Sequence, residues 1–149
     1  LGAPEYGLIA QALGKIPKPT SLYCSHLGDE GAAALAPTFA SMSSLTRLDL
    51  SSNSLSAGAG SALGKALEGL PNLRELCLGV LEPPCATREE LDSCYDRRNT
   101  AAQGPGLLEA LAGHANLARV DLSGHRLGAG GLERLAAATQ TLPITDLDL

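Results

Sequence analysis

The residues of this sequence that could do chemistry recur at regular intervals along the chain. One acidic set surrounds a thiol, and its members are Ser21, Asp49, Cys77, Asp121 and Asp148. Carboxylates around a thiol could hold a metal ion, but carboxylates on adjacent strands without a histidine are more often solvated. We therefore expect no metal site, and instead an acidic patch that attracts a basic partner.

A second set alternates in charge, and its members are Pro19, Arg47, Glu75, Arg119 and Asp146. On strands about 4.8 Å apart, its last four members would form a ladder of opposite charges. Exposed ion pairs of this kind usually contribute under about 1 kcal/mol each. The ladder would therefore lend modest support to the fold and fix the register of the strands.

No catalytic constellation accompanies these two sets. His26, His114 and His125 have no serine or cysteine at a spacing that indicates a nucleophile pair, so we expect them to face solvent or to bond within turns. The stretch AGAGSALGK, residues 57–65, lacks the order of a phosphate-binding loop, because Ala66 follows Lys65. The sequence predicts a protein that is not an enzyme and uses no cofactor or small-molecule substrate.

A leucine repeat defines the elements that must position these residues. In LTRLDLSSNSL, residues 45–55, leucines stand at 45, 48, 50 and 55, and the pattern returns after 28 residues. Later copies are Leu73, Leu76 and Leu78, then Leu117, Val120 and Leu122, then Ile144, Leu147 and Leu149. Upstream, Leu22, Leu27, Gly31, Leu35 and Phe39 match Leu50, Leu55, Ala59, Leu63 and Leu67 at an offset of 28. About five units fit, two of them partial, so residues 1–149 are predicted to form one repeat domain.

Each unit is expected to contain a short strand, a turn and a helix. Alternate strand residues face opposite ways, so Leu48 and Leu50 would point into the core and Asp49 out of it. The amide of Asn53 would satisfy backbone groups in the turn. Equivalent positions hold Ser25, Leu81 and His125, and the register near Cys24 could slip by one. A single unit cannot bury both faces, so stacked units would form a curved α/β solenoid.

The pattern resembles the leucine-rich repeat, in the ribonuclease-inhibitor-like subfamily that includes NOD-like receptors. The resemblance implies parallel strands on a concave face, helices on a convex face, and a protein partner bound by the concave face. The partner-binding residues it implies are Arg47, Asp49, Glu75, Cys77, Arg119 and Asp121, with Tyr23 as an aromatic anchor. Ran-type GTPase activators share the pattern. The alternative is therefore such an activator, which would supply a loop arginine from Arg126, Arg97 or Arg98.

One unit carries an insertion. Leu73 and Leu117 are 44 residues apart instead of 28, which leaves 16 extra residues, within about 79–103. Thr87 and Glu90 predict a capped helix near 88–95. The segment is either a tolerated surface loop or a second binding element, in which Tyr95, Arg97 and Arg98 combine residue types enriched at binding hot spots.

Composition limits the remaining classes. The formal charge is −5 and no basic cluster exceeds the pair Arg97–Arg98, so we expect no nucleic-acid partner. No apolar run is long enough to cross a bilayer, so no membrane role is expected. The four cysteines lack zinc-site spacing and are expected to be free thiols in the cytoplasm, with a Cys85–Cys94 disulfide as the alternative. The chain begins at Leu1, and we expect it to be part of a larger protein.

Overall fold

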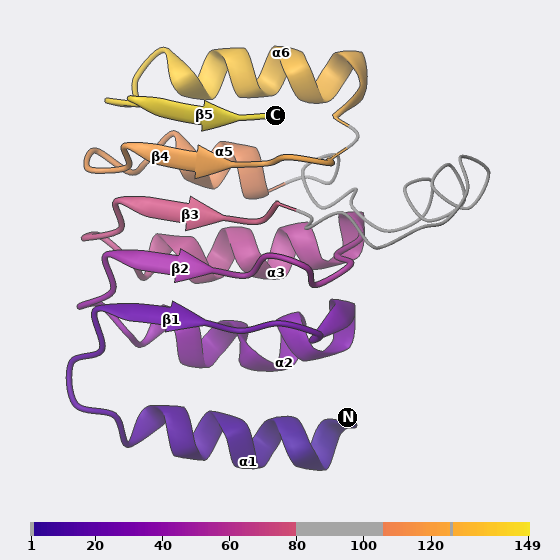
Figure 1. Cartoon of the computed structure of the whole chain (residues 1–149), viewed down its shortest axis with the longest axis vertical. Coiled ribbons are helices and arrows are strands. Elements are labelled where there is room, and N and C mark those ends of the chain that lie inside the picture. Colours follow the sequence, from indigo (N-terminus) through magenta and orange to yellow (C-terminus); the bar gives the residue numbers. More distant parts are fainter. Residues whose placement is uncertain (1, 80–105, 126) are drawn as a thin grey trace.

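Helices and three-residue strands alternate along the chain (Figure 1). The structure is a computed structural model that describes residues 2–79, 106–125 and 127–149. In chain order the elements are α1 (Ala3–Gly14), β1 (Ser21–Tyr23), α2 (Gly28–Ala40), β2 (Arg47–Asp49), α3 (Ala57–Glu68), β3 (Glu75–Cys77), α5 (Leu107–Leu111), β4 (Arg119–Asp121), α6 (Gly128–Thr139) and β5 (Asp146–Asp148).

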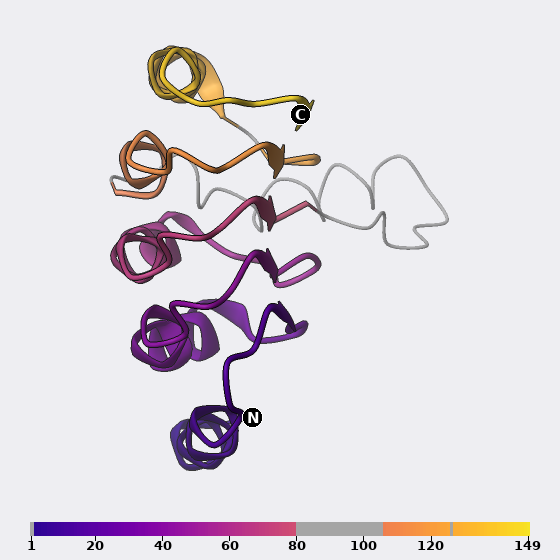
Figure 2. The ribbon, with the colours of Figure 1, turned by 90° about the vertical axis from the view of Figure 1, so that its left-hand side faces the viewer.

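The strands of the described residues form one parallel sheet in the order β1-β2-β3-β4-β5. Each strand pairs with the next, and the chain returns through a helix between them. The helices therefore stack on one side of the molecule and the strands on the other (Figure 2). The strands follow the inner side of a shallow arc and the helices its outer side. This arrangement confirms the predicted α/β leucine-rich-repeat solenoid.

The core lies between the sheet and the helices and is built mainly from leucine. In the unit of residues 45–72 the buried leucines are Leu45, Leu48, Leu50, Leu55, Leu63, Leu67 and Leu70. Arg47 and Asp49 alternate with the first of these and lie partly exposed on the other side of the strand. Leucines two residues apart in the strand and four apart in the helix therefore all point into the core between the sheet and the helices.

Asn53 joins two consecutive turns, as its position in the repeat predicts. Its Oδ1 accepts a hydrogen bond from the Leu27 N–H at 2.7 Å. Its Nδ2 donates to the carbonyl oxygens of Cys24 at 2.7 Å and Leu50 at 2.6 Å. The side chain is only 3% exposed, so these bonds satisfy backbone groups that water does not reach.

The expected register of the first strand is wrong. Pro19 does not pair with Arg47, and Ser21 does not pair with Asp49. The observed register places Ser21 beside Arg47 and Tyr23 beside Asp49. Tyr23 is therefore the neighbour of Asp49 on the inner face of the sheet.

A shorter turn after β1 causes this difference. The Cys24 N–H donates to the next strand's Asp49 carbonyl, just as the Leu50 N–H donates to the Cys77 carbonyl. Cys24 thus takes the place of the core leucine, at an offset of 26 from Leu50. The helices keep an offset of 28, so the turn is two residues shorter and Ser25 is not the equivalent of Asn53.

The helical register returns at α5, as the leucine spacing predicts. Leu107 and Leu111 are fully buried there, in positions equivalent to Leu63 and Leu67 of α3. The predicted insertion, its capped helix and the candidate pair Cys85–Cys94 lie almost entirely outside the described residues. Within the ranges that the structure describes, no helix is long and apolar enough to cross a bilayer.

Candidate functional site

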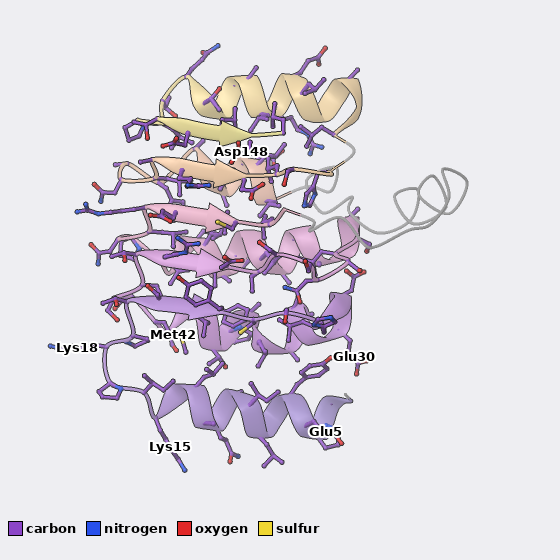
Figure 3. The ribbon with its side chains drawn as sticks, viewed as in Figure 1. Glu5, Lys15, Lys18, Glu30, Met42 and Asp148 are labelled. Atoms are coloured by element: carbon purple, nitrogen blue, oxygen red, sulfur yellow. The ribbon has the colours of Figure 1, made fainter. Side chains whose placement is uncertain are left out.

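The inner face of the sheet carries two rows of outward-pointing side chains, which we call the strand face. The first row contains Ser21, Arg47, Glu75, Arg119 and Asp146. The second row contains Tyr23, Asp49, Cys77, Asp121 and Asp148. The rows arise because the first and third residues of each strand point away from the core. Seven of the candidate binding residues thus lie together on one surface. Asp148 of the second row is labelled beside β5 in Figure 3.

Arg47 organises the β1–β3 end of the strand face. Its guanidinium donates to Glu75 on the next strand at 2.8 Å and approaches Asp49 on its own strand at 3.4 Å. The same group lies over the ring of Tyr23, 5.2 Å from the ring centre. Desolvation opposes the charge of Arg47, but Tyr23, Asp49 and Glu75 outweigh it and raise the pKa. Arg47 therefore stays charged and holds the ring and both carboxylates in place.

Tyr23 is the exposed aromatic group of this end. Tyr23 is 61% exposed, whereas the preceding residue, Leu22, is buried in the core. Because the ring rests on the Arg47 guanidinium, its conformation is restrained before any partner arrives. A restrained, exposed tyrosine loses little conformational entropy on binding.

The centre of the strand face is the thiol of Cys77, which is only 5% exposed. Burial raises the pKa of Cys77, and the Asp49 carboxylate adds to this effect, while Arg47 opposes it. The thiol is therefore protonated at neutral pH and is a poor nucleophile. Cys77 and Cys24 are both free cysteines.

The β4–β5 end carries more negative charge than the other. Arg119 pairs with Asp148 at 3.6 Å. Asp121 accepts the backbone N–H of Ser123 at 2.9 Å, and Asp146 accepts the Thr145 hydroxyl at 2.9 Å. Within the described residues, neither Asp121 nor Asp146 forms an ion pair. Asp146 and Asp148 belong to the two predicted sets and extend the surface beyond the predicted partner-binding residues.

Gly79 leaves room for the Asp121 carboxylate. A Cβ atom at Gly79 would collide with the Asp121 carboxylate and the Ser123 hydroxyl. Two strands away, on β2, Asp49 likewise accepts the backbone N–H of Ser51 at 3.1 Å. Each of these carboxylates is thus fixed by the turn that follows its strand.

The histidines lie in three different environments. His26 is exposed, and its Nδ1 lies 3.1 Å from the Ser25 hydroxyl. His114 replaces the buried Leu70 of the preceding unit and is only 5% exposed, so the first of the two expected environments, exposure to solvent, does not apply to it. His125 occupies the turn position of Asn53, and its Nε2 lies 2.9 Å from the Leu78 carbonyl oxygen. None of them belongs to the strand face.

Burial lowers the pKa of both His114 and His125. Backbone carbonyl groups oppose this effect, those of Leu67 and Leu70 at His114 and that of Leu78 at His125. Both histidines are therefore neutral near pH 7 and act as structural groups of the repeat. Their burial could have been predicted from their positions in the repeat, since each histidine stands where another unit has a buried leucine or asparagine.

Several candidate residues lie outside the part of the chain that the structure describes. They are Tyr95, Arg97, Arg98, and the loop arginine Arg126. Among the described residues, no group of three or more histidine, cysteine, aspartate or glutamate side chains is arranged to hold a metal ion. Within the described part of the chain, the strand face thus combines charged pairs, an exposed ring and two carboxylates that form no ion pair, those of Asp121 and Asp146.

Comparisons with known proteins agree with this fold. A family profile described as Leucine Rich repeat matches residues 41–64. A solved structure titled "Leiomodin-1 Actin-Binding Site 2 (ABS2)" is similar at 17% identity and a TM-score of 0.58, over 95% of this chain and 73% of that one. A tropomodulin C-terminal domain of Caenorhabditis elegans is similar at 12% identity and a TM-score of 0.45, over 92% of each chain. The search among curated proteins finds no match.

The profile match and the leiomodin-1 structure support one class. Residues 41–64 match the leucine-rich repeat profile, and the described residues form an α/β leucine-rich-repeat solenoid with an open strand face. At this level of identity the likeness to leiomodin-1 extends to the fold alone.

Proposed function

We propose that this protein is a non-catalytic protein-interaction module that binds a partner through the strand face. The observation that carries the proposal is the exposed Tyr23 ring held on Arg47 at one end of two rows of charged side chains. Tyrosine and arginine are the residue types most often found at the energetic centre of protein interfaces. A row of fixed charges beside them adds orientation and selectivity.

The chemistry of the face supports binding over catalysis. The central thiol of Cys77 has a raised pKa, and the histidines His114 and His125 lie away from the face. The leiomodin-1 structure is titled as an actin-binding site, which is in keeping with a binding role for a solenoid of this kind. We also propose that the chain belongs to the ribonuclease-inhibitor-like subfamily of leucine-rich repeats, which includes NOD-like receptors. Their long units with a helical second half resemble the units without the insertion, which are 26 to 28 residues long here.

The inserted segment forms a second part of the proposal. Gly79, the last described residue before the segment, lies beside the Asp121 carboxylate of the strand face. A partner seated on that face would therefore lie near the start of the segment. Tyr95, Arg97 and Arg98 supply the residue types that would extend the contact. The free thiols of Cys24 and Cys77 are compatible with a reducing compartment, and we propose a cytoplasmic location.

Site-specific photo-crosslinking tests the proposed surface. A photoreactive phenylalanine replaces Tyr23 in one variant and Glu133, on the exposed side of α6, in a matched control variant. Circular dichroism first confirms that both variants fold. We expect one or more proteins to crosslink from position 23 and not from position 133. Partners that crosslink only from position 133, or equally from both, would overturn the strand face as the binding surface.

A further inference from the structure

The strand face carries an excess of negative charge that its own arginines do not neutralise. Its acidic side chains are Asp49, Glu75, Asp121, Asp146 and Asp148, and its basic ones are Arg47 and Arg119. Five carboxylates against two guanidinium groups leave a formal excess of three negative charges. A surface of this kind favours a partner of opposite charge and repels nucleic acid.

This excess is concentrated at one end of the face. Arg47 is engaged with Glu75 and Asp49, and Arg119 is engaged with Asp148. Asp121 and Asp146 lie on the adjacent strands β4 and β5 and form no ion pair within the described residues. Their carboxylates are also fixed by bonds to Ser123 and Thr145. They are therefore placed to accept charged hydrogen bonds with little loss of their own freedom.

The size of the face fits an extended chain that crosses the strands. Four strand spacings cover about 19 Å, which an extended segment of about six residues spans. The buried thiol of Cys77 lies between Asp49 and Asp121 in the second row, and no large side chain rises there. Long lysine or arginine side chains could reach the carboxylates on either side of it.

We propose that the strand face binds a lysine- or arginine-rich extended segment of a partner protein, whose basic side chains pair with Asp121 and Asp146. The segment runs across the strands from β5 toward β1, and an apolar residue at its other end packs on Tyr23. This inference rests on the proposed function and specifies the chemistry of its partner.

Peptide binding tests the inference. The probe is a fluorescein-labelled peptide of about eight residues in which lysine alternates with alanine and a leucine stands at one end, a length that spans the face. Its counterpart has glutamate in place of lysine. Fluorescence anisotropy measures the affinity of both peptides for the full chain at low and at moderate salt. We expect the lysine peptide to bind and its affinity to fall as salt rises, and the glutamate peptide not to bind.

Variants with matched charge changes locate the site. Asp121→Asn and Asp146→Asn together should weaken the lysine peptide by about fivefold for each carboxylate. Glu68→Gln and Glu133→Gln remove the same charge from exposed positions of α3 and α6, and should leave the affinity nearly unchanged. Tyr23→Ala should weaken the lysine peptide, whereas Leu8→Ala, at another exposed apolar position, should not.

Three results would overturn the inference: no binding of the lysine peptide, equal binding of both peptides, or equal weakening by the two double variants. These failures are separate from failure of the proposed function. If a partner crosslinks at position 23 through a neutral or acidic segment, the strand face remains the binding surface. Only the inference that the bound segment is basic is then wrong.

Discussion

At the scale of single residues, Asn53 links two consecutive units of the repeat. Its amide accepts from the Leu27 N–H and donates to the Cys24 carbonyl of the preceding turn, and donates also to the Leu50 carbonyl of its own. All three partners are backbone groups. These hydrogen bonds therefore require only that the backbone keeps its conformation. They do not depend on the side chains of the three partner residues.

Replacement of Asn53 by alanine should cost about 2–3 kcal/mol of unfolding free energy, because it leaves buried backbone groups without partners. Urea denaturation followed by circular dichroism measures the loss. Asn72→Ala is a matched control, since Asn72 makes one exposed bond to the Ser43 carbonyl at 2.9 Å. That variant should lose about 1 kcal/mol or less. Equal losses in the two variants would contradict the role given to Asn53.

His125 takes the turn position of Asn53 and adds a dependence on pH. Its Nε2 lies 2.9 Å from the Leu78 carbonyl oxygen and donates there. Its Nδ1 is buried and has no hydrogen-bond partner within the described residues. Protonation would place a charge on this buried nitrogen, which is the physical cause of the lowered pKa of His125.

The stability of the protein should therefore fall as pH drops below about 6.5, the ordinary pKa of histidine. Because the pKa of both histidines is lowered in the folded chain, the unfolded chain binds more protons at His125 and His114 in that range than the folded chain does. Denaturation at pH 7.5 and pH 5.5 measures the difference. His125→Asn should reduce it, and His114→Leu should reduce it further. Carboxylates whose pKa is lowered in the folded chain, such as Glu109, change the free energy of unfolding only nearer pH 4.5. A pH effect that survives both substitutions would contradict this assignment.

The rows of the strand face could be predicted from residue types and spacing, with one exception. Arg47, Asp49, Cys77 and their equivalents are fixed by their place beside core leucines, and the structure brings them together. The neighbour of Asp49 on β1 could not be predicted. Cys24 takes the place of a core leucine there. An alignment that pairs leucine with leucine assumes that every turn has the same length, and this turn is shorter. The ion pairs and the Tyr23–Arg47 contact depend on side-chain conformations that spacing does not determine.

At the scale of elements, α3 and the start of α5 approach closely at a point where both supply glycine. A Cβ atom at Gly64 of α3 would overlap the backbone carbonyl of Gly106, which immediately precedes α5. Gly106 itself has a φ of 101°, a conformation that other residues rarely adopt. The start of α5 is therefore fixed by two glycines that are distant in sequence.

Gly64→Ala should destabilise the protein by about 1–3 kcal/mol, because the added methyl group meets backbone that cannot rotate away. Gly7→Ala is the matched control in α1, where an added Cβ atom has nothing within 4 Å. That substitution should stabilise the protein by about 0.5–1 kcal/mol through helix propensity. Thermal unfolding of both variants measures the effects. Stabilisation by Gly64→Ala would show that the two units move apart at little cost.

At the scale of the whole molecule, each described helix packs on the next helix in the stack of units. The contacts run from α1 to α2, α2 to α3, α3 to α5 and α5 to α6, and the strands follow the same order. The stability of such a solenoid is approximately a sum over units and the interfaces between them. A periodic sequence specifies such a fold well, because each unit repeats the same local interactions. This explains why the class of fold could be predicted and a local change of turn length could not.

The inserted segment tests this additive view. Leu78 and Leu107 stand on either side of it and are both buried, in the positions of Leu50 and Leu63. Deletion of residues 82–97 would restore the regular distance between them. Loop closure depends weakly on length, so the free energy of unfolding should change by about 1 kcal/mol or less. Circular dichroism and thermal unfolding measure the result. A control variant replaces the same residues with a glycine–serine linker of equal length, which separates the effect of length from that of sequence. If both variants lose the cooperative transition, the segment itself supplies packing that the solenoid needs. If both keep it, the solenoid folds without the segment, and a loss of partner crosslinking in these variants would then report recognition alone.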